Sequence, residues 1–307
     1  MQKNILLIYY TQSGQGKAIA DSILNPLKEA PNINIDEYKI LPKTPYPFPW
    51  SSDAFFDSMP ESVKGIGCEL EDTEIDTEKN YDLILLAFPV WYLSPAIPTA
   101  AFMQSDKGRA VLKNKNIITV SGLRNMGAAA QEDMLKYIKA ADARPVGNIA
   151  LRDKENNLVS VLTIIRWLMK GKKEASGRLP EAGVNQEDIE AAQRFGFTLK
   201  QAIEENNYKE LNKKLLKQGA NELKYSVLNM ELKAKKIFGL WANLILKKGP
   251  AGDKKRIRRV RAFKYYLLTV IFVVSPVAGL IFNIQKTLFP KKAQKQLDYY
   301  RNIQNRD

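Results

Sequence analysis

The sequence predicts an α/β fold in which five parallel strands form a doubly wound sheet with helices on both faces. Five short runs are rich in apolar and β-branched residues, and helical patterns separate most of them. Strands that alternate with helices indicate a parallel sheet covered on both sides. Right-handed crossovers then favour the strand order 2-1-3-4-5. The strands are expected near residues 4–10, 34–40, 81–88, 116–121 and 145–151.

The helices between these strands are the crossovers of such a sheet. The apolar spacing predicts them at residues 17–29, 98–112 and 128–141. A further amphipathic helix over 188–204 is expected to close the domain. Because the chain has 307 residues, it can bury a sizeable core and still carry further segments. We therefore assign residues 1–205 to one α/β domain.

Two stretches of this domain exceed a minimal sheet. Residues 42–76 form an insertion whose first part, 42–60, is rich in proline and aromatic residues. Such a segment is either a lid over a pocket or plain packing over the sheet. Residues 152–185 hold an extra apolar segment and a loop. This stretch could dock on the sheet or add an apolar wall that faces a membrane.

The rest of the chain is expected to be a helical extension followed by a membrane-associated tail. We assign the helical extension to 206–248, a basic hinge to 249–264, a membrane segment to 265–284 and a basic tail to 285–307. The twenty residues of the membrane segment carry no charged side chain. As a helix they would be about 30 Å long, which is the thickness of the hydrocarbon core of a bilayer.

The basic charge of the chain is concentrated in this C-terminal part. Residues 247–307 hold 15 of the 47 Lys and Arg residues, but only 3 of the 33 Asp and Glu residues. Basic residues beside an apolar segment attract anionic lipid headgroups, whereas a segment that binds nucleic acid would not continue into twenty apolar residues. We therefore expect a membrane partner and no nucleic-acid partner. A buried helical hairpin of a soluble protein is the alternative.

How this segment meets the membrane stays open at this stage. Pro276 lies near its middle and basic residues flank both ends, which suits a bent, re-entrant or surface-lying segment as well as a spanning helix. Because the N-terminal flank is the more basic one, a spanning helix would keep the catalytic domain in the cytoplasm. Met1–Asn4 leads directly into the first strand, so we expect no signal peptide.

The composition excludes several kinds of catalysis. The chain has no histidine and a single cysteine, Cys68. Disulfides, zinc sites and Ser-His or Cys-His catalysis are therefore excluded, and we expect no metal ion. We interpret Cys68 as a bystander thiol in a reducing compartment.

The loop after the first strand predicts a phosphate site. Hydroxyls, glycines and then a helix follow the strand, so backbone N–H groups and the positive end of a helix dipole surround one point. The spacing matches neither the nucleotide P-loop nor the dinucleotide fingerprint. An ordinary βα turn with small residues is the alternative. The residues expected to bind a phosphorylated cofactor are Thr11, Gln12, Ser13, Gly14, Gln15 and Gly16.

Two further loops are expected at the same edge of the sheet, after the third and fourth strands. Trp91 and Tyr92 could supply a flat surface for an isoalloxazine ring, and Asn125 could form a hydrogen bond to it. Alternatively, Trp91 only caps the core, Arg124 forms a surface ion pair and Asn125 caps the next helix. The expected cofactor contacts in these loops are Pro89, Val90, Trp91, Tyr92, Leu93, Gly122, Arg124 and Asn125.

Taken together, these loops resemble those of the flavodoxin-like superfamily. The matching motifs are Thr-x-Ser-Gly-x-Gly, Pro-Val-Trp-Tyr and Gly-x-Arg-Asn-Met, and the resemblance covers about residues 1–205. It implies a flavodoxin-like fold with bound FMN. Gly16 occupies the place of the last hydroxyl residue in such phosphate loops, so one phosphate hydrogen bond would be missing.

The whole chain is also similar to a narrower bacterial family, the dialkylresorcinol condensing enzymes. The similarity lies in residues 46–50, 90–95, 124–126 and 147–151 and in the basic, apolar C-terminus. That family is associated with dialkylresorcinols, the lipid part of flexirubin-type pigments. The resemblance implies an FMN-dependent oxidoreductase that aromatises a dialkylcyclohexane-1,3-dione, next to a ketosynthase-like partner that performs the condensation.

In that reaction Arg124 is the expected anchor of the substrate enolate, and Tyr92 is the expected proton relay. Three other functions stay open. They are an NAD(P)H-dependent FMN quinone reductase, a flavodoxin-type electron carrier, and a non-enzymatic subunit of the condensing system that has lost FMN. Alkyl chains of the dione would partition into lipid, so a membrane-bound enzyme would meet its substrate there.

Overall fold

A computed structural model describes residues 2–303 of the chain. Its central sheet has five parallel strands in the order β2-β1-β3-β6-β7, which is the predicted order 2-1-3-4-5 once the short hairpin strands are set aside. The α/β prediction and the flavodoxin-like strand order are therefore confirmed. The strands are β1 (Lys3–Tyr9), β2 (Ile33–Lys39), β3 (Leu83–Ala87), β6 (Asn116–Leu123) and β7 (Arg144–Arg152).

Helices cover both faces of this sheet, and alternating strand residues enter two separate cores. Ile5 and Leu7 point to one core, whereas Leu6 and Ile8 point to the other. The helices of the first face are α1 (Gln15–Lys28), α8 (Gln186–Glu190), α9 (Gln193–Glu204) and α10 (Leu211–Lys217). Those of the second face are α4 (Ile97–Gln104), α5 (Asp106–Leu112) and α6 (Ala128–Ala140).

The helix predicted over 98–112 is divided in two at Ser105. This residue is extended, and its hydroxyl accepts a hydrogen bond from the N–H of Gly108 at 3.0 Å. A serine that caps the next helix in this way stops the previous one, because both cannot share its backbone conformation.

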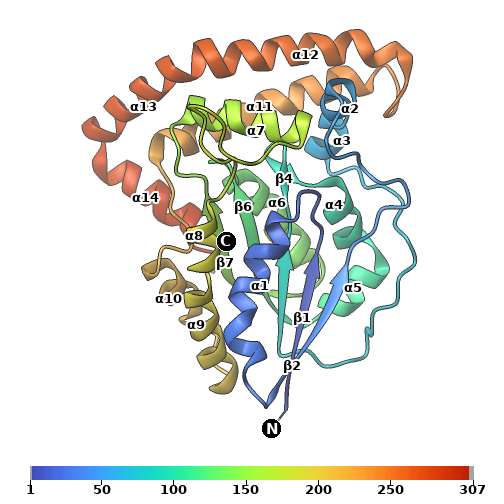
Figure 1. Ribbon diagram of the computed structural model, residues 1–307, viewed down its shortest axis with the longest axis vertical. Coiled ribbons are helices and arrows are strands. Elements are labelled where there is room, and N and C mark those ends of the chain that lie inside the picture. Colours follow the sequence, from blue (N-terminus) through green and yellow to red (C-terminus); the bar gives the residue numbers. More distant parts are fainter. Residues whose placement is uncertain (1, 304–307) are drawn as a thin grey trace.

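The two extra stretches of the domain lie at the carboxyl end of the sheet. The insertion forms α2 (Ser52–Asp57) and α3 (Met59–Lys64), and the apolar segment forms α7 (Asn157–Lys170). A two-stranded hairpin of β4 (Val90–Trp91) and β5 (Ser94–Pro95) follows β3. Figure 1 shows α2, α3 and α7 gathered at the end of the molecule opposite to the N-terminus.

The C-terminal part is almost entirely helical. After α11 (Tyr225–Leu246), a turn at Gly249–Gly252 reverses the chain, and a continuous helix runs from Lys254 to Leu288. That helix consists of a 3₁₀ turn (Lys254–Arg256), α12 (Ile257–Thr269), a π turn (Val270–Val274) and α13 (Ser275–Leu288), and α14 (Pro290–Arg301) follows it. The hinge predicted over 249–264 is thus confined to the first few of those residues.

The π turn explains how Pro276 fits inside this long helix. Proline has no N–H to donate and its ring collides with the preceding turn. The wider π turn comes directly before α13 and so lies in the turn that precedes Pro276, where the helix has to accommodate the proline ring and its missing N–H.

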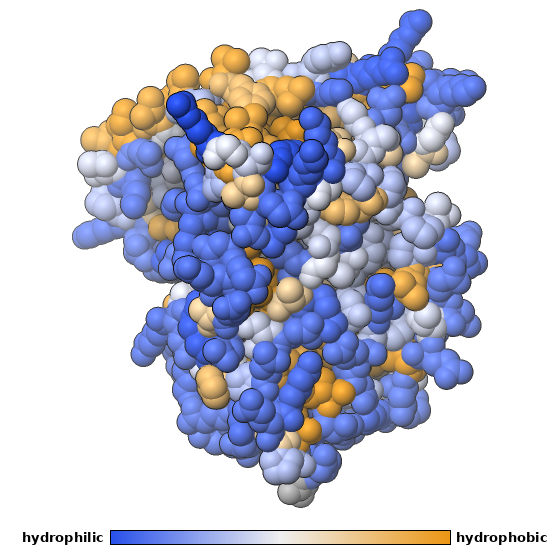
Figure 2. Space-filling view, viewed as in Figure 1, coloured by the Kyte–Doolittle hydropathy of each residue, from blue (hydrophilic) through white to orange (hydrophobic). Residues whose placement is uncertain are grey.

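The helix Lys254–Leu288 is the one helix among the described residues that is long and apolar enough to cross a membrane. By length and composition alone this is weak support for a membrane span, and only 6% of its most apolar window is buried in the protein. It lies across the carboxyl end of the sheet and packs against α11 (Figure 1). Large apolar side chains on its outer side are exposed, and they form the apolar area in Figure 2. Such an exposed area marks a surface that binds a partner or a membrane.

Candidate functional site

The loop after β1 forms an open, uncapped helix start. Gly14 has a φ of +83°, and its N–H donates to the hydroxyl of Thr11 at 3.0 Å. No side chain caps α1, and among the described residues none accepts a hydrogen bond from the N–H groups of Ser13, Gln15 or Gly16. The space next to Gly14 is empty within 4 Å. These free donors point to an anion at the amino end of α1.

The basic residue that follows this loop is already paired with two carboxylates. Lys17, the nearest basic residue in the chain, is paired with Asp21 at 2.5 Å and with Glu37 at 3.2 Å. An anion would therefore be held by backbone N–H groups and by the hydroxyls of Thr11 and Ser13. Because Thr11 accepts the Gly14 N–H, its own proton is left for a ligand.

The two glutamines of the loop hold it in place. Gln12 donates to the carbonyl of Pro47 at 2.8 Å and accepts from the indole of Trp50 at 3.1 Å. Gln15 bonds both the N–H and the carbonyl of Val184, at 3.3 and 3.1 Å. Gln12 thus ties the loop to the insertion, and Gln15 ties it to the stretch after α7. Their amide groups are engaged by the protein itself.

The loop after β3 is a tight hairpin. Tyr92 and Leu93, at its tip, have φ values of +48° and +61°. Residues with a Cβ rarely adopt this left-handed conformation, and each costs on the order of 1 kcal/mol or more. The turn is held from outside by Lys235 of α11, which donates to the carbonyl of Leu93 at 3.0 Å and contacts Ser94. Pro89 accepts the N–H of Ala96 and closes the base of the loop.

Trp91 lies within a group of aromatic rings. Its ring centre is 5.0 Å from Tyr46, 5.3 Å from Trp50 and 6.0 Å from Tyr10, all in edge-to-face arrangements. The Pro-rich insertion thus packs directly on the loop after β3, and through Trp50 and Gln12 it also reaches the loop after β1. The insertion bridges two of the three loops.

Tyr92 is placed differently from its neighbour. Its hydroxyl donates to the carbonyl of Phe55 at 2.8 Å, and its ring packs against Phe238 and Phe263. Burial raises the pKa of this phenol well above its ordinary value of 10. A hydroxyl whose proton is committed to a backbone carbonyl is poorly suited to proton transfer, so we do not retain the proton-relay role predicted for Tyr92.

The loop after β6 converges on one asparagine at the start of α7. Arg124 donates to the side-chain oxygen of Asn157 at 2.8 Å, and Asn125 donates to the same oxygen at 2.5 Å. The side-chain oxygen of Asn125 is buried and has no hydrogen-bond partner among residues 2–303. Asn125 does not cap α6, whose N-cap residue is Gly127. The orphaned oxygen is a place where a ligand N–H could donate.

Arg124 keeps its charge without a direct carboxylate partner. Burial lowers the pKa of its guanidinium to about 10, and the charge of Asp153 opposes that change. No described carboxylate forms an ion pair with it. A desolvated cation of this kind is available for an anionic ligand.

Gly122 lies close to helix α1. A Cβ at this position would lie 2.9 Å from the side chain of Ile19 and 3.4 Å from that of Gln15. Helix α1 therefore approaches this glycine closely, and the cofactor contact that we expect at Gly122 stays a prediction.

A hollow of about 170 Å³ separates the hairpin from the loop after β6. This is less than the 300–1,000 Å³ typical of ligand pockets, so a flavin ring would require some displacement of the side chains around it. Trp91 and Tyr92 are not among its lining residues. The hollow is lined by Val90, Leu93, Gly122, Leu123, Arg124, Asn125 and Met126.

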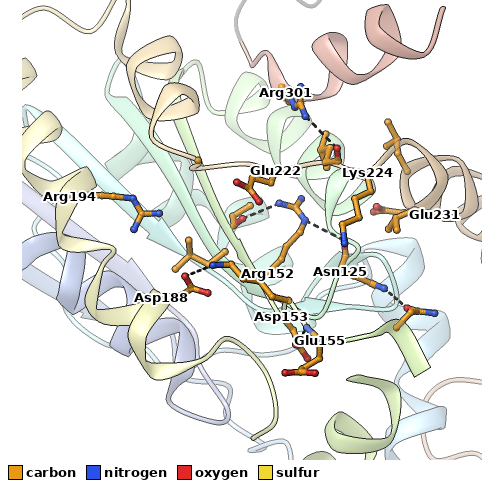
Figure 3. A pocket seen from close by; sticks show the side chains of 18 residues that line it. Asn125, Arg152, Asp153, Glu155, Asp188, Arg194, Glu222, Lys224, Glu231 and Arg301 are labelled. Carbon is orange, nitrogen blue, oxygen red and sulfur yellow. Dashed lines mark hydrogen bonds and ion pairs between the residues drawn. The ribbon is translucent and has the colours of Figure 1, made fainter. Parts of the chain in front are cut away.

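A larger cavity of about 520 Å³ lies beside this hollow, and Asn125 lines both (Figure 3). Arg152 reaches into it from the end of β7 and donates to the carbonyls of Asn125 and Ala150 at 3.3 and 3.0 Å. Burial lowers the pKa of this guanidinium to about 10. The charged residues around the cavity, apart from Arg152, are Asp153, Lys154, Glu155, Asp188, Arg194, Glu222, Lys224, Glu231 and Arg301.

Glu231 of α11 caps the amino end of α6, the second helix that begins at this edge of the sheet. Its carboxylate accepts the N–H of Ala129 at 2.8 Å and lies against those of Gly127 and Ala128, at the amino end of α6. The carboxylate of Glu231 therefore excludes an anionic ligand from the amino end of α6. Of these two helix starts, that of α1 is the open one.

Sequence reasoning missed Asn157, Arg152 and Glu231. For Asn157 a signal was present, because Asn156 and Asn157 directly precede an apolar helical run and mark a helix start. Glu231 lies in a charged helix with nothing that distinguishes it from its neighbours, and its partner is 102 residues away.

No protein-family model matches the sequence, and no curated protein matches it significantly. Solved structures with a similar fold include a flavoprotein in complex with FMN from Lactobacillus acidophilus NCFM. It is 22% identical, with a TM-score of 0.38 over 50% of this chain and 95% of that one.

Two other solved structures are similar. A flavodoxin from the domain Archaea is 13% identical, with a TM-score of 0.36 over 66% of this chain and 99% of that one. A putative flavoprotein from Bacteroides uniformis ATCC 8492 is 16% identical, with a TM-score of 0.37 over 55% and 100%. These scores are low, so the assignment of the fold rests on the strand order of the sheet.

Proposed function

We propose that this protein is an FMN-dependent oxidoreductase that acts on a lipophilic substrate at a membrane. The observation that carries the proposal is the open start of α1, where the N–H groups of Ser13, Gln15 and Gly16 have no acceptor among the described residues. This point suits the phosphate of FMN. The orphaned oxygen of Asn125, at the same edge of the sheet, suits an N–H of the flavin ring.

The substrate that we propose is a dialkylcyclohexane-1,3-dione, which would be aromatised to a dialkylresorcinol. The dione loses two electrons and two protons, and FMN, when bound, supplies a two-electron acceptor. Such a dione is acidic and would bind as its enolate. Arg124 is the residue available for that anion, because it lines the hollow and forms no ion pair with a described carboxylate.

The assignment agrees with the apolar C-terminal helix. A substrate with two alkyl chains partitions into lipid, and an enzyme on the membrane surface meets it there. We place the catalytic domain on the cytoplasmic side, because the anionic lipids of the cytoplasmic leaflet attract the basic residues that flank the apolar segment. A ketosynthase-like partner would supply the dione, because this chain lacks the histidine that condensation chemistry uses.

The test uses the full-length chain, purified in detergent and loaded with FMN. Without oxygen, a synthetic dialkylcyclohexane-1,3-dione should bleach the flavin absorption and yield one resorcinol per flavin, measured by mass spectrometry. Arg124→Met should raise the substrate concentration needed by about tenfold or more, whereas Arg109→Met, an exposed arginine on α5, should not. A protein that binds no FMN would contradict the proposal as a whole.

One observation favours a second function, an NAD(P)H-dependent quinone reductase. The 520 Å³ cavity with the guanidinium of Arg152 lies next to the hollow and could take the phosphates of a nicotinamide nucleotide. A reductase would be bleached by NAD(P)H alone, and Arg152→Met would weaken that reaction. In the aromatase, the dione would bleach the flavin absorption and NAD(P)H would leave it unchanged.

A further inference from the structure

The long apolar helix is attached to the body of the protein at both of its ends. At its start, the buried guanidinium of Arg256 bonds Glu61 and Asp57, on the insertion. Beyond its end, α14 returns to the body, where Ala293 and Leu297 are buried in one cluster with Leu228 of α11. A helix fixed in this way cannot place its two ends on opposite sides of a bilayer unless one end undocks.

A few residues of this helix pack on the body, whereas most of its apolar side chains are exposed. Val260, Phe263 and Phe282 are buried toward the body, and Phe282 lies under the ammonium of Lys233 at 4.8 Å. The outer side carries a stripe of residues spaced three or four apart, each between 58% and 66% exposed. We call these residues the outer stripe: Val273, Val277, Leu280, Ile284 and Leu288.

Basic residues lie at both ends of the outer stripe. Before it, the exposed residues are Lys254, Lys255, Arg258 and Arg261. Lys286 lies within its last turn, and Lys291, Lys292 and Lys295 follow it. An apolar stripe between two basic groups complements an anionic lipid surface, with acyl chains under the stripe and headgroups at its ends. A protein partner would have to match both features at once.

The neighbouring helix α11 adds to this apolar surface. Ile237, Leu240 and Leu244 are 38%, 68% and 42% exposed and follow a helical spacing. Helices α11 and α13 pack side by side, and in Figure 2 the apolar residues gather at the end of the molecule where they lie. That end is also the carboxyl end of the sheet.

We infer that residues 254–288 lie in the plane of an anionic bilayer, in one leaflet, with the outer stripe in the acyl region. The candidate site at the carboxyl end of the sheet then faces the membrane, and a lipophilic substrate enters from the leaflet. The inference rests on the membrane association proposed above, but it is independent of the flavin.

A flotation assay tests the lipid binding. The full-length chain is mixed with vesicles of phosphatidylcholine alone or with about 30% phosphatidylglycerol. We expect the native chain to float with the anionic vesicles, and Val277→Asp with Leu280→Asp to reduce the bound fraction at least tenfold. Phe197→Asp is the matched control, because this side chain on α9 is 59% exposed and does not belong to residues 254–288. Loss of binding in the control, or no binding by the native chain, overturns the inference.

Labelling of single cysteines tests the orientation. In a Cys68→Ser background, Glu204→Cys marks the body and Lys295→Cys marks α14. In sealed membrane vesicles of an expressing bacterium, an impermeant maleimide should label both positions from the same side. Labelling from opposite sides shows a spanning helix and overturns the inference. FMN affinity, measured in parallel on the stripe variant, should be unchanged, so that failure of membrane binding and failure of flavin binding are told apart.

Discussion

The guanidinium of Arg256 forms two hydrogen bonds with the carboxylate of Glu61, at 2.6 and 3.0 Å, and is completely buried. It also bonds the carboxylate of Asp57 at 2.6 Å. These partners lie 195 and 199 residues away in the chain, on the insertion. One buried ionic group therefore joins the start of the membrane helix to the segment that packs over the candidate site.

Removal of this arginine should be strongly destabilising. Arg256→Met leaves Glu61 buried without its partner, and breaking a buried pair costs about 3–5 kcal/mol. Arg261→Met is the matched control, since its ion pair with Asp53 at 3.3 Å is more than half exposed and worth about 1 kcal/mol or less. Urea unfolding measures the free energy of unfolding of both variants. Equal losses in the two variants would contradict the structural role of the buried pair.

Tyr92→Phe should leave the reaction almost unchanged. The variant loses the hydrogen bond to Phe55, which contributes about 1 kcal/mol to stability, but keeps the ring in its aromatic cluster. We expect a slightly lower Tm and a kcat within about a factor of two of the native value. A drop in kcat of a hundredfold with intact FMN binding would restore the proton-relay role.

Glu231 gives the protein a pH dependence of known sign. Burial raises the pKa of this carboxyl above its ordinary value of 4.5, against the hydrogen bonds that favour the charged form. Because the pKa is higher in the folded state, the contribution of Glu231 to the free energy of unfolding is complete below pH 4.5. This contribution is lost as the pH rises through the folded-state pKa. Glu231→Gln keeps an acceptor for the N–H of Ala129. Its free energy of unfolding should fall less than that of the native chain as the pH rises through the folded-state pKa of Glu231. An unchanged pH profile would contradict this assignment.

Sequence patterns were sufficient for the sheet and for the position of the loop that leads into the uncapped start of α1. Four of the five strands contain a short run of buried residues, whereas β2, at the edge of the sheet, is mostly exposed or half-buried. The order of the strands follows from chirality once strands and helices alternate. The loop at 11–16 was visible because glycine and hydroxyl residues directly follow a buried strand. These features are local, and local features can be recognised in a sequence.

The contacts around the ring site could not be predicted, because they join distant segments. The ring of Trp91, for which the flavin contact stays a prediction, is surrounded by Tyr10, Tyr46 and Trp50. Which aromatic residue faces a ligand depends on how the insertion folds over the sheet, and residue type does not encode that. The same holds for Arg256, which the sequence analysis counted with the basic hinge and which is the most deeply buried charge in its neighbourhood.

The most direct test of the central claim is a titration of the purified chain with FMN, followed by quenching of flavin fluorescence. The native chain should bind one FMN, and Ser13→Glu, which places a negative charge at the exposed start of α1, should weaken binding by about a hundredfold or more, or about 2.7 kcal/mol. Ala140→Glu adds the same charge at the far end of α6 and should bind like the native chain. Equal FMN affinity in Ser13→Glu and Ala140→Glu, or no binding by the native chain, would contradict a phosphate site at the start of α1.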